Sequence, residues 1–125
     1  MRLLLDTHTL LWSLQDSRRL SPTARRYLQQ ADAVYVSAVC LWEIAIKSQL
    51  GKLRADPAAL VEAIAASGFL ELPVTWRHAS ALHGLPPLHR DPFDRMLVAQ
   101  AITEPLRLIT HDEALRPYSD LVTMI

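Results

Sequence analysis

The sequence predicts an α/β fold with helices on both faces of a parallel sheet of four to five strands. Short apolar runs alternate with longer segments whose apolar residues recur at helical spacing, and this alternation is typical of parallel sheets. The first run, Leu3–Leu5, is continuously apolar, as in a strand buried on both faces. The 125 residues, half of them apolar, suit one domain, residues 1–125, with a sizeable core.

Local signals place the elements in order. A cap residue followed by proline starts three helices, at Ser21-Pro22, Asp56-Pro57 and Asp91-Pro92. Gly51 closes the helical pattern that precedes it, as glycine often does. In chain order we expect a strand at 3–5, helices at 9–14 and 22–31, a strand at 33–37, helices at 39–50 and 57 to near 68, a strand at 69–72, helices at 76–83 and 92–103, and strands at 107–110 and 121–124.

Composition excludes several classes of protein. Thirteen Lys and Arg balance thirteen Asp and Glu, so a strongly basic nucleic-acid coat is absent and any phosphate-binding patch must be local. The single Cys40 allows no intrachain disulfide and fits a reducing compartment. Neither a signal peptide nor a transmembrane run is present, so we expect a cytoplasmic protein with no membrane contact. The generous apolar share predicts a homodimer.

Four acidic residues lie at or just beyond the expected carboxyl ends of the strands. Asp6 follows the first strand, and Asp112 lies two residues past the strand that ends at Thr110. Glu43 lies about one turn into the helix after the second strand, and Asp94 in the first turn of the helix before the fourth. Ligands of parallel α/β sheets bind at this edge, so we expect these carboxylates to share one cleft.

Carboxylates that converge in one cleft repel each other unless protons or a cation neutralise them. An all-oxygen ligand set favours Mg²⁺, with Mn²⁺ as an alternative. Such an ion lowers the pKa of a water molecule and stabilises charge on the leaving oxygen of a phosphodiester. The acids therefore predict a metal-dependent nuclease.

Each acid also has a structural interpretation. Asp91 and Asp94 occupy the N-cap and N3 positions of a helix, where capping alone explains them. Asp112 can cap the segment that follows it, and Glu43 can pair with Lys47 one turn later. The acid that ends the first buried strand is the hardest to explain structurally.

Four stretches around these acids resemble the PIN-domain family, and more narrowly its VapC-type toxins. They follow in order along the chain: LLLDTHTLLW (3–12), VSAVCLWEIAIKSQLGKL (36–53), HRDPFDRMLVAQA (89–101) and LITHDEAL (108–115). The resemblance covers essentially the whole chain. It implies a three-layer α/β/α sandwich, a Mg²⁺- or Mn²⁺-dependent endoribonuclease that cuts RNA, and inhibition by a cognate antitoxin encoded beside the toxin.

The resemblance also implies a role for each acid. Asp6, Glu43, Asp94 and Asp112 match the four catalytic acids of the family. We expect the first and third as direct metal ligands, and the other two to act directly or through water. Thr110 matches the hydroxyl residue that often precedes the fourth acid by two positions.

Further residues have a functional and a structural interpretation. Asp91 is an additional acid of uncertain role, and Thr7 and Ser37 can support the metal site or act as caps. Arg90 and Arg95 are candidates for RNA contacts, together with His89 beside them and Arg77, His78 and His83 upstream; their alternative is ordinary solvated charge. Trp12, Trp42 and Trp76 can stack on bases, but the apolar pattern around the first two favours core or interface packing.

Two other functions compete with a nuclease. A response-regulator receiver domain has similar length and an acidic Mg²⁺ pocket, but it requires paired acids after the first strand and a late Lys, and no Lys follows Lys52. A catalytically silent α/β protein-binding module would not need all four acids. The chain has only three glycines and lacks a glycine-rich phosphate loop.

Overall fold

A computed structural model describes residues 1–125, which form a five-stranded parallel sheet flanked by helices. The strands lie in the order β3-β2-β1-β4-β5, so the chain's first strand is central. Their bounds are β1 (Arg2–Leu5), β2 (Ala33–Ser37), β3 (Leu70–Leu72), β4 (Arg107–Thr110) and β5 (Val122–Met124). The predicted parallel sheet and the strand count are confirmed.

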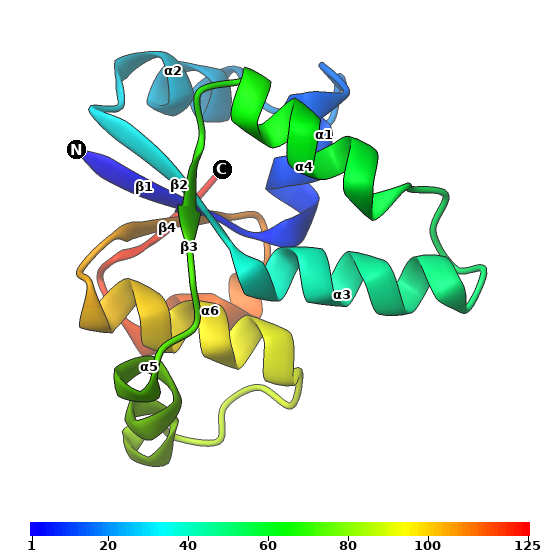
Figure 1. Ribbon diagram of the computed structural model, residues 1–125. Coiled ribbons are helices and arrows are strands. Elements are labelled where there is room, and N and C mark those ends of the chain that lie inside the picture. Colours follow the sequence, from blue (N-terminus) through cyan, green and yellow to red (C-terminus); the bar gives the residue numbers. More distant parts are fainter.

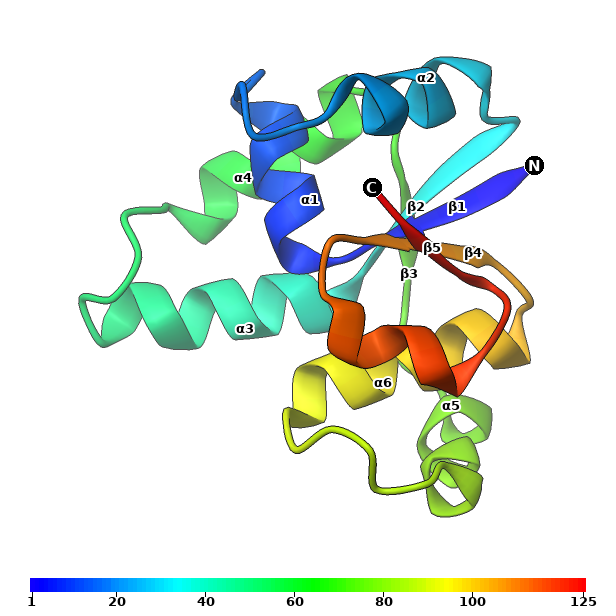
Figure 2. The same ribbon diagram turned by 180° about the vertical axis from the view of Figure 1, so that it is seen from behind.

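Helices cover both faces of the sheet, as predicted for a three-layer α/β/α sandwich (Figure 1). Helices α1, α2 and α4 lie on one face, whereas α5, α6 and a 3₁₀ helix after β4 lie on the other (Figure 2). Helix α3 extends beyond the carboxyl ends of the strands and contacts both α4 and α6. The bounds are α1 (Thr7–Leu14), α2 (Pro22–Gln30), α3 (Ala38–Gln49), α4 (Pro57–Ala66), α5 (Trp76–Ala81), α6 (Pro92–Thr103) and the 3₁₀ helix Glu113–Tyr118.

The three cap-plus-proline signals start their helices where the sequence predicts. The side chains of Ser21, Asp56 and Asp91 each accept a backbone N–H of the first turn of their helix. Helix α1 differs, because it begins at Thr7 rather than at the ninth residue. The reason is that Asp6 itself is the N-cap of α1, a role that the apolar pattern does not reveal.

The strand order places the candidate site at the point where the topology reverses. From β1 the chain proceeds to β2 on one side, whereas β4, the other neighbour of β1, leads to β5 on the opposite side. Ligands of open α/β sheets bind at such a switch point. Register pairs Leu5 with Ile109, so β1 and β4 end next to each other. Receiver domains have the order 2-1-3-4-5, so this topology excludes a receiver.

The core holds the central strands rigidly. Leu3, Leu4 and Leu5 are fully buried, as are Leu108 and Ile109 beside them. Close-packed interiors have low compressibility, so the buried strands hold the residues that follow β1 and β4 in place. None of the helices combines the length and apolar character that a bilayer crossing requires.

Candidate active site

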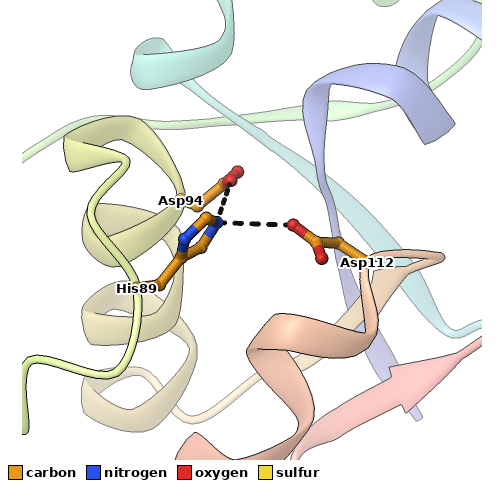
Figure 3. Close-up of side chains that lie close together, drawn as sticks. All are labelled: His89, Asp94 and Asp112. Atoms are coloured by element: carbon orange, nitrogen blue, oxygen red, sulfur yellow. Dashed lines mark hydrogen bonds and ion pairs between the residues drawn. The ribbon is translucent and has the colours of Figure 1, made fainter.

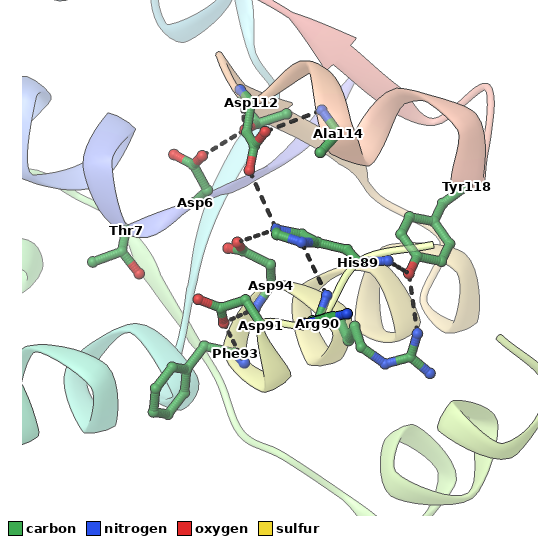
Figure 4. Close-up of polar contacts among 12 residues, drawn as sticks. Asp6, Thr7, His89, Arg90, Asp91, Phe93, Asp94, Asp112, Ala114 and Tyr118 are labelled. Atoms are coloured by element: carbon green, nitrogen blue, oxygen red, sulfur yellow. Dashed lines mark hydrogen bonds and ion pairs between the residues drawn. The ribbon is translucent and has the colours of Figure 1, made fainter. Parts of the chain in front are cut away.

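A cleft of about 310 Å³ opens at the carboxyl end of β1 and β4, and no hydrophobic residue lines it. It contains all four predicted acids and two more carboxylates, against one lysine. The lining residues are Asp6, Thr7, His8, Glu43, Lys47, Asp91, Asp94, His111, Asp112 and Glu113. Figure 4 shows that the acids labelled there come from β1, α6 and the segment after β4. The predicted convergence of the acids is therefore observed.

Asp6 joins β1 to α1 and is 4% exposed. Its Oδ1 accepts the backbone N–H of Thr9 at 2.8 Å, and its Oδ2 accepts the hydroxyl of Thr110 at 2.6 Å. One carboxylate therefore caps a helix and also receives a hydrogen bond from the neighbouring strand. These two bonds fix the orientation of the side chain before any ligand arrives.

Glu43 is 5% exposed and lies on α3. Its Oε1 accepts the hydroxyl of Thr7 at 2.6 Å, and its Oε2 pairs with Nζ of Lys47 at 2.6 Å. The predicted pairing with Lys47 is thus present, and the hydrogen bond to Glu43 raises the pKa of this lysine. A paired carboxylate can still line the cleft, because each oxygen has a second lone pair.

Asp94 lies in the first turn of α6, beside the N-cap Asp91. Burial raises the pKa of Asp94 to about 6, and the negative charges of Asp91, Asp6 and Glu43 add to this effect. A hydrogen bond from His89 opposes it. The carboxylates of the cleft therefore repel each other, as the sequence predicts.

His89 bridges the third and fourth acids. Its Nε2 lies 3.0 Å from Oδ2 of Asp94 and 3.4 Å from Oδ2 of Asp112 (Figure 3). Its Nδ1 accepts the backbone N–H of Arg90 at 3.1 Å, so Nε2 carries the ring proton and donates it towards the carboxylates. From the sequence, His89 is only an RNA-contact candidate, and this bridging role is not evident. The one feature that could have indicated a contact with Asp94 is that His89 lies only five residues before it.

Structural and functional interpretations of the acids prove compatible. Asp112 caps the following 3₁₀ helix through Oδ1, which accepts the N–H of Ala114 at 3.0 Å, while its Oδ2 faces His89. Asp91 uses Oδ1 for both of its capping bonds, to Phe93 and Asp94. Since capping occupies a single oxygen in each case, a second oxygen stays available to the cleft.

The predicted supporting hydroxyls divide into two groups. Thr7 and Thr110 contact the acids directly, as described above. Ser37 does not line the cleft; it caps α3 by accepting the N–H of Val39 at 3.0 Å and borders an apolar cavity instead. The capping alternative describes Ser37, because the end of β2 turns directly into α3.

The two candidate arginines differ in their surroundings. Arg95 donates to the carbonyl of Pro86 at 2.9 Å and to Oη of Tyr118 at 3.0 Å, so its guanidinium anchors the loop before α6. The exposed guanidinium of Arg90 has no protein partner and extends from the residue next to His89. Arg90 therefore remains the better placed of the two to reach a substrate.

Two other expectations need correction. His78 is 1% exposed and completes the capping box of α5, so it is a structural residue and no part of a charged rim. Of the two packing roles expected for Trp42, core or interface, the structure overturns the core: the side chain is 60% exposed and contacts the ring of Phe93 edge-on, with centroids 5.0 Å apart. Its helical position is apolar in pattern, but α3 projects beyond the sheet and leaves that face uncovered.

The only cysteine does not supply a nucleophile. Cys40 is fully buried below the cleft, with Sγ 3.7 Å from the carbonyl oxygen of Leu5. Burial raises the pKa of this thiol to about 12, so it stays protonated at neutral pH. The ionisable side chains that line the cleft are carboxylates, two histidines and Lys47.

The donor set fits a hard divalent cation. Carboxylate oxygens dominate the cleft, and one carboxylate oxygen of Asp94 lies within 4.8 Å of one of Asp112. Oxygen ligands favour Mg²⁺ and Mn²⁺. A bound cation would also relieve the repulsion that raises the pKa of Asp94.

We expect Thr110→Val to weaken Mn²⁺ binding about 10- to 100-fold and to lower stability by about 1–3 kcal/mol. The isosteric change removes the hydroxyl that donates to Asp6 and also accepts the N–H of Asp112 at 3.0 Å. Calorimetric titration with Mn²⁺ and urea unfolding measure the two effects. Thr110→Ser retains the hydroxyl and is the control; equal Mn²⁺ affinity of the valine and serine variants would contradict the orienting role.

Comparison with known proteins connects this site to a family. Residues 3–121 match the PIN domain. The chain is 30% identical over 117 residues to "Ribonuclease VapC22" of Mycobacterium tuberculosis, covering 92% of this chain and 90% of that protein.

Solved structures share the fold at low sequence identity. VapBC2 from Rickettsia felis, solved with a DNA fragment from its promoter, superposes with a TM-score of 0.73 at 13% identity and covers 100% of this chain and 98% of that one. A toxin–antitoxin complex from Klebsiella pneumoniae gives 0.60 at 20% identity, covering 88% and 86%. These likenesses confirm the predicted α/β/α architecture.

Proposed function

This chain belongs to the PIN domain family, and from that premise we propose that it is a metal-dependent endoribonuclease, the toxin of a toxin–antitoxin pair. The observation that carries the proposal is the cleft in which Asp6, Glu43, Asp94 and Asp112 meet at the switch point of the sheet. The ribonuclease name of its 30%-identical relative supports the reaction class. We further propose that residues 1–125 act as a single PIN-like nuclease domain.

Asp6 and Asp94 are proposed as the direct metal ligands. Asp6 is held by bonds from two different elements, which supports a preorganised ligand. Asp94 has one oxygen near His89, and burial together with the charge of Asp91 raises its pKa in the metal-free cleft. Glu43 and Asp112 complete the cluster, directly or through water, and Thr7 and Thr110 orient the acids they contact.

Mg²⁺ or Mn²⁺, when bound, would supply an activated water and a positive charge beside the scissile phosphate. Side chains of the protein itself position the acids. His89 holds Asp94 and Asp112 close together through Nε2–H, and Asp91 adds negative charge at the N-terminus of α6. Arg90, exposed beside the cleft, is proposed to contact an RNA phosphate; Arg95 holds the loop that carries it.

The test is cleavage of a mixed RNA pool by purified protein with Mg²⁺ or Mn²⁺. Cleavage that stops with EDTA and returns with excess metal supports the proposal. Sequencing of the product ends identifies the preferred site. Folded protein that binds Mn²⁺ but leaves every RNA in the pool intact would argue for the catalytically silent protein-binding alternative.

A cognate antitoxin and self-association are proposed as partners. The toxin–antitoxin complex of Klebsiella pneumoniae has this fold, which supports an antitoxin here. Trp42 on α3 and Leu50, the C-cap of this helix, are 60% and 62% exposed, which supports a homodimer. Expression without the antitoxin is expected to arrest growth, and light scattering of the purified chain is expected to give twice the 14.1 kDa chain mass.

A further inference from the structure

Three aromatic rings meet at the rim of the acidic cleft, and we propose that they form a stacking platform for one unpaired base of the substrate. The platform consists of His8, Trp12 and His111. This inference rests on the proposed function, because it assigns a subsite next to the nuclease centre. It adds a requirement that the metal site does not impose: the substrate must offer an unstacked base.

The rings are mutually close, although they come from two elements. The centroid of Trp12 lies 4.7 Å from that of His111 and 5.8 Å from that of His8, with which it is stacked at an interplanar angle of 30°. The two histidines meet edge-on at 5.6 Å. These separations lie within the range of aromatic pairs, so the three rings form one cluster, in which His111 is tilted by 56° to Trp12 and by 86° to His8.

The platform is accessible and adjoins the acids. His8 and His111 are exposed and line the cleft, while Trp12 is half-buried beneath them on α1. In the sequence, His8 lies two residues after Asp6, and His111 directly precedes Asp112. A phosphate held at these acids through a bound cation would therefore place its neighbouring nucleotide within reach of the rings.

A core role does not explain this arrangement. Side chains that only complete a core are buried, whereas these histidines face solvent beside the cleft. None of the three rings makes a hydrogen bond or ion pair with the rest of the protein through its side chain. Exposed aromatic faces without polar partners are what base stacking uses in single-strand binding.

Stacking predicts a class of substrate. Bases paired within an A-form helix have both faces covered, so a platform of this kind selects single-stranded segments, loops or ends. The contact is tolerant of base identity because every base has an aromatic face. The platform is therefore expected to contact whichever unpaired base lies next to the bound phosphate, whatever its identity.

The experiment compares two single-stranded ten-nucleotide RNAs, one of mixed sequence and one with the same sugar–phosphate chain but no bases. Binding is measured by fluorescence anisotropy with all acids of the cleft retained and with Ca²⁺, which binds oxygen ligands, in place of Mg²⁺; the length of each RNA is checked afterwards to verify that it was not cut. The platform variant is His8→Ala/His111→Ala, and the control is Gln29→Ala, which truncates an exposed polar side chain of α2 outside the cleft. Trp12 remains, so the half-buried position is not disturbed.

We expect the platform variant to bind the base-bearing RNA about 5- to 100-fold more weakly and the baseless chain unchanged. In a Trp42→Phe/Trp76→Phe protein, only the base-bearing RNA is expected to quench Trp12 fluorescence. An equal loss for both oligomers would mean that the histidines contact phosphate by charge, and no loss for either would mean that the rings do not touch RNA; each result overturns the proposal. Failure of the nuclease proposal is separate, because it appears as absent RNA cleavage by the wild-type protein.

Discussion

Replacement of Asp94 by asparagine is expected to lower metal-dependent RNA cleavage by at least about a thousandfold in a protein that stays folded. A loss of this size corresponds to about 4 kcal/mol of transition-state stabilisation, which is reasonable for a metal ligand. Asparagine retains an oxygen that can accept the hydrogen bond of His89 at 3.0 Å, so the local structure is preserved. Only the charge and one metal-binding oxygen are lost.

The measurement is initial cleavage rate with Mn²⁺, together with calorimetric Mn²⁺ titration and circular dichroism. Asp120→Asn is the matched control, because it makes the same chemical change at an exposed carboxylate outside the cleft. We expect the control to retain wild-type activity and Mn²⁺ affinity. A folded Asp94→Asn protein that binds Mn²⁺ and cleaves normally would remove this residue from the proposed ligand set.

The fold could be predicted from the sequence because its signals are local. Continuous apolar runs mark buried parallel strands, and Ser21-Pro22, Asp56-Pro57 and Asp91-Pro92 mark helix starts that the structure confirms. The convergence of the acids also followed, because parallel strands end at one edge of a sheet and Asp6 and Asp112 come after two of them.

The features of the site that the sequence did not predict depend on contacts between segments that are distant in sequence. Thr110 reaches Asp6 across 104 residues, and His89 reaches Asp112 from the loop before α6. No periodicity encodes such pairs. The exposure of Trp42 is a similar case, because its apolar surroundings in sequence do not reveal that α3 projects beyond the sheet.

The two interpretations of the acids, cap or ligand, could not be separated by sequence because one fixed carboxylate is suited to both roles. A cap needs one oxygen and a fixed side chain, and a metal ligand benefits from the same fixation. Asp6 shows this most clearly: its bond to the N–H of Thr9 both starts α1 and orients the carboxylate in the cleft. Helix caps at the carboxyl edge of a sheet are thus suitable starting points for a metal site.

Asp94 is expected to make the metal-free protein lose stability as the pH rises. The folded-state pKa of Asp94 is raised from 3.8 to about 6, chiefly by burial and by the charge of Asp91. Between these values the folded protein binds more protons at this site than the unfolded chain, so the free energy of unfolding falls as pH rises from about 4 to 6. Below about pH 4 the stabilising contribution of protonated Asp94 is fully present, and above about pH 6 the metal-free cleft holds the unneutralised charge of this carboxylate.

Urea unfolding in EDTA at pH 4 to 7.5 measures this dependence, and Asp94→Asn isolates it, since every other titrating group is shared by the two proteins. Partial exposure of Asp94 reduces the effect, so we expect the variant to gain on the order of 1–2 kcal/mol relative to wild type over the window. Saturating Mn²⁺ is expected to reverse the order at neutral pH, because it stabilises only a protein that binds it. A difference between the two proteins that is independent of pH would show that Asp94 ionises without penalty, and the cleft would then need no cation to neutralise it. If Asp94→Asn is instead more stable without metal, less stable with metal and catalytically inactive, the charge that destabilises the metal-free cleft is the same charge that metal binding and cleavage require.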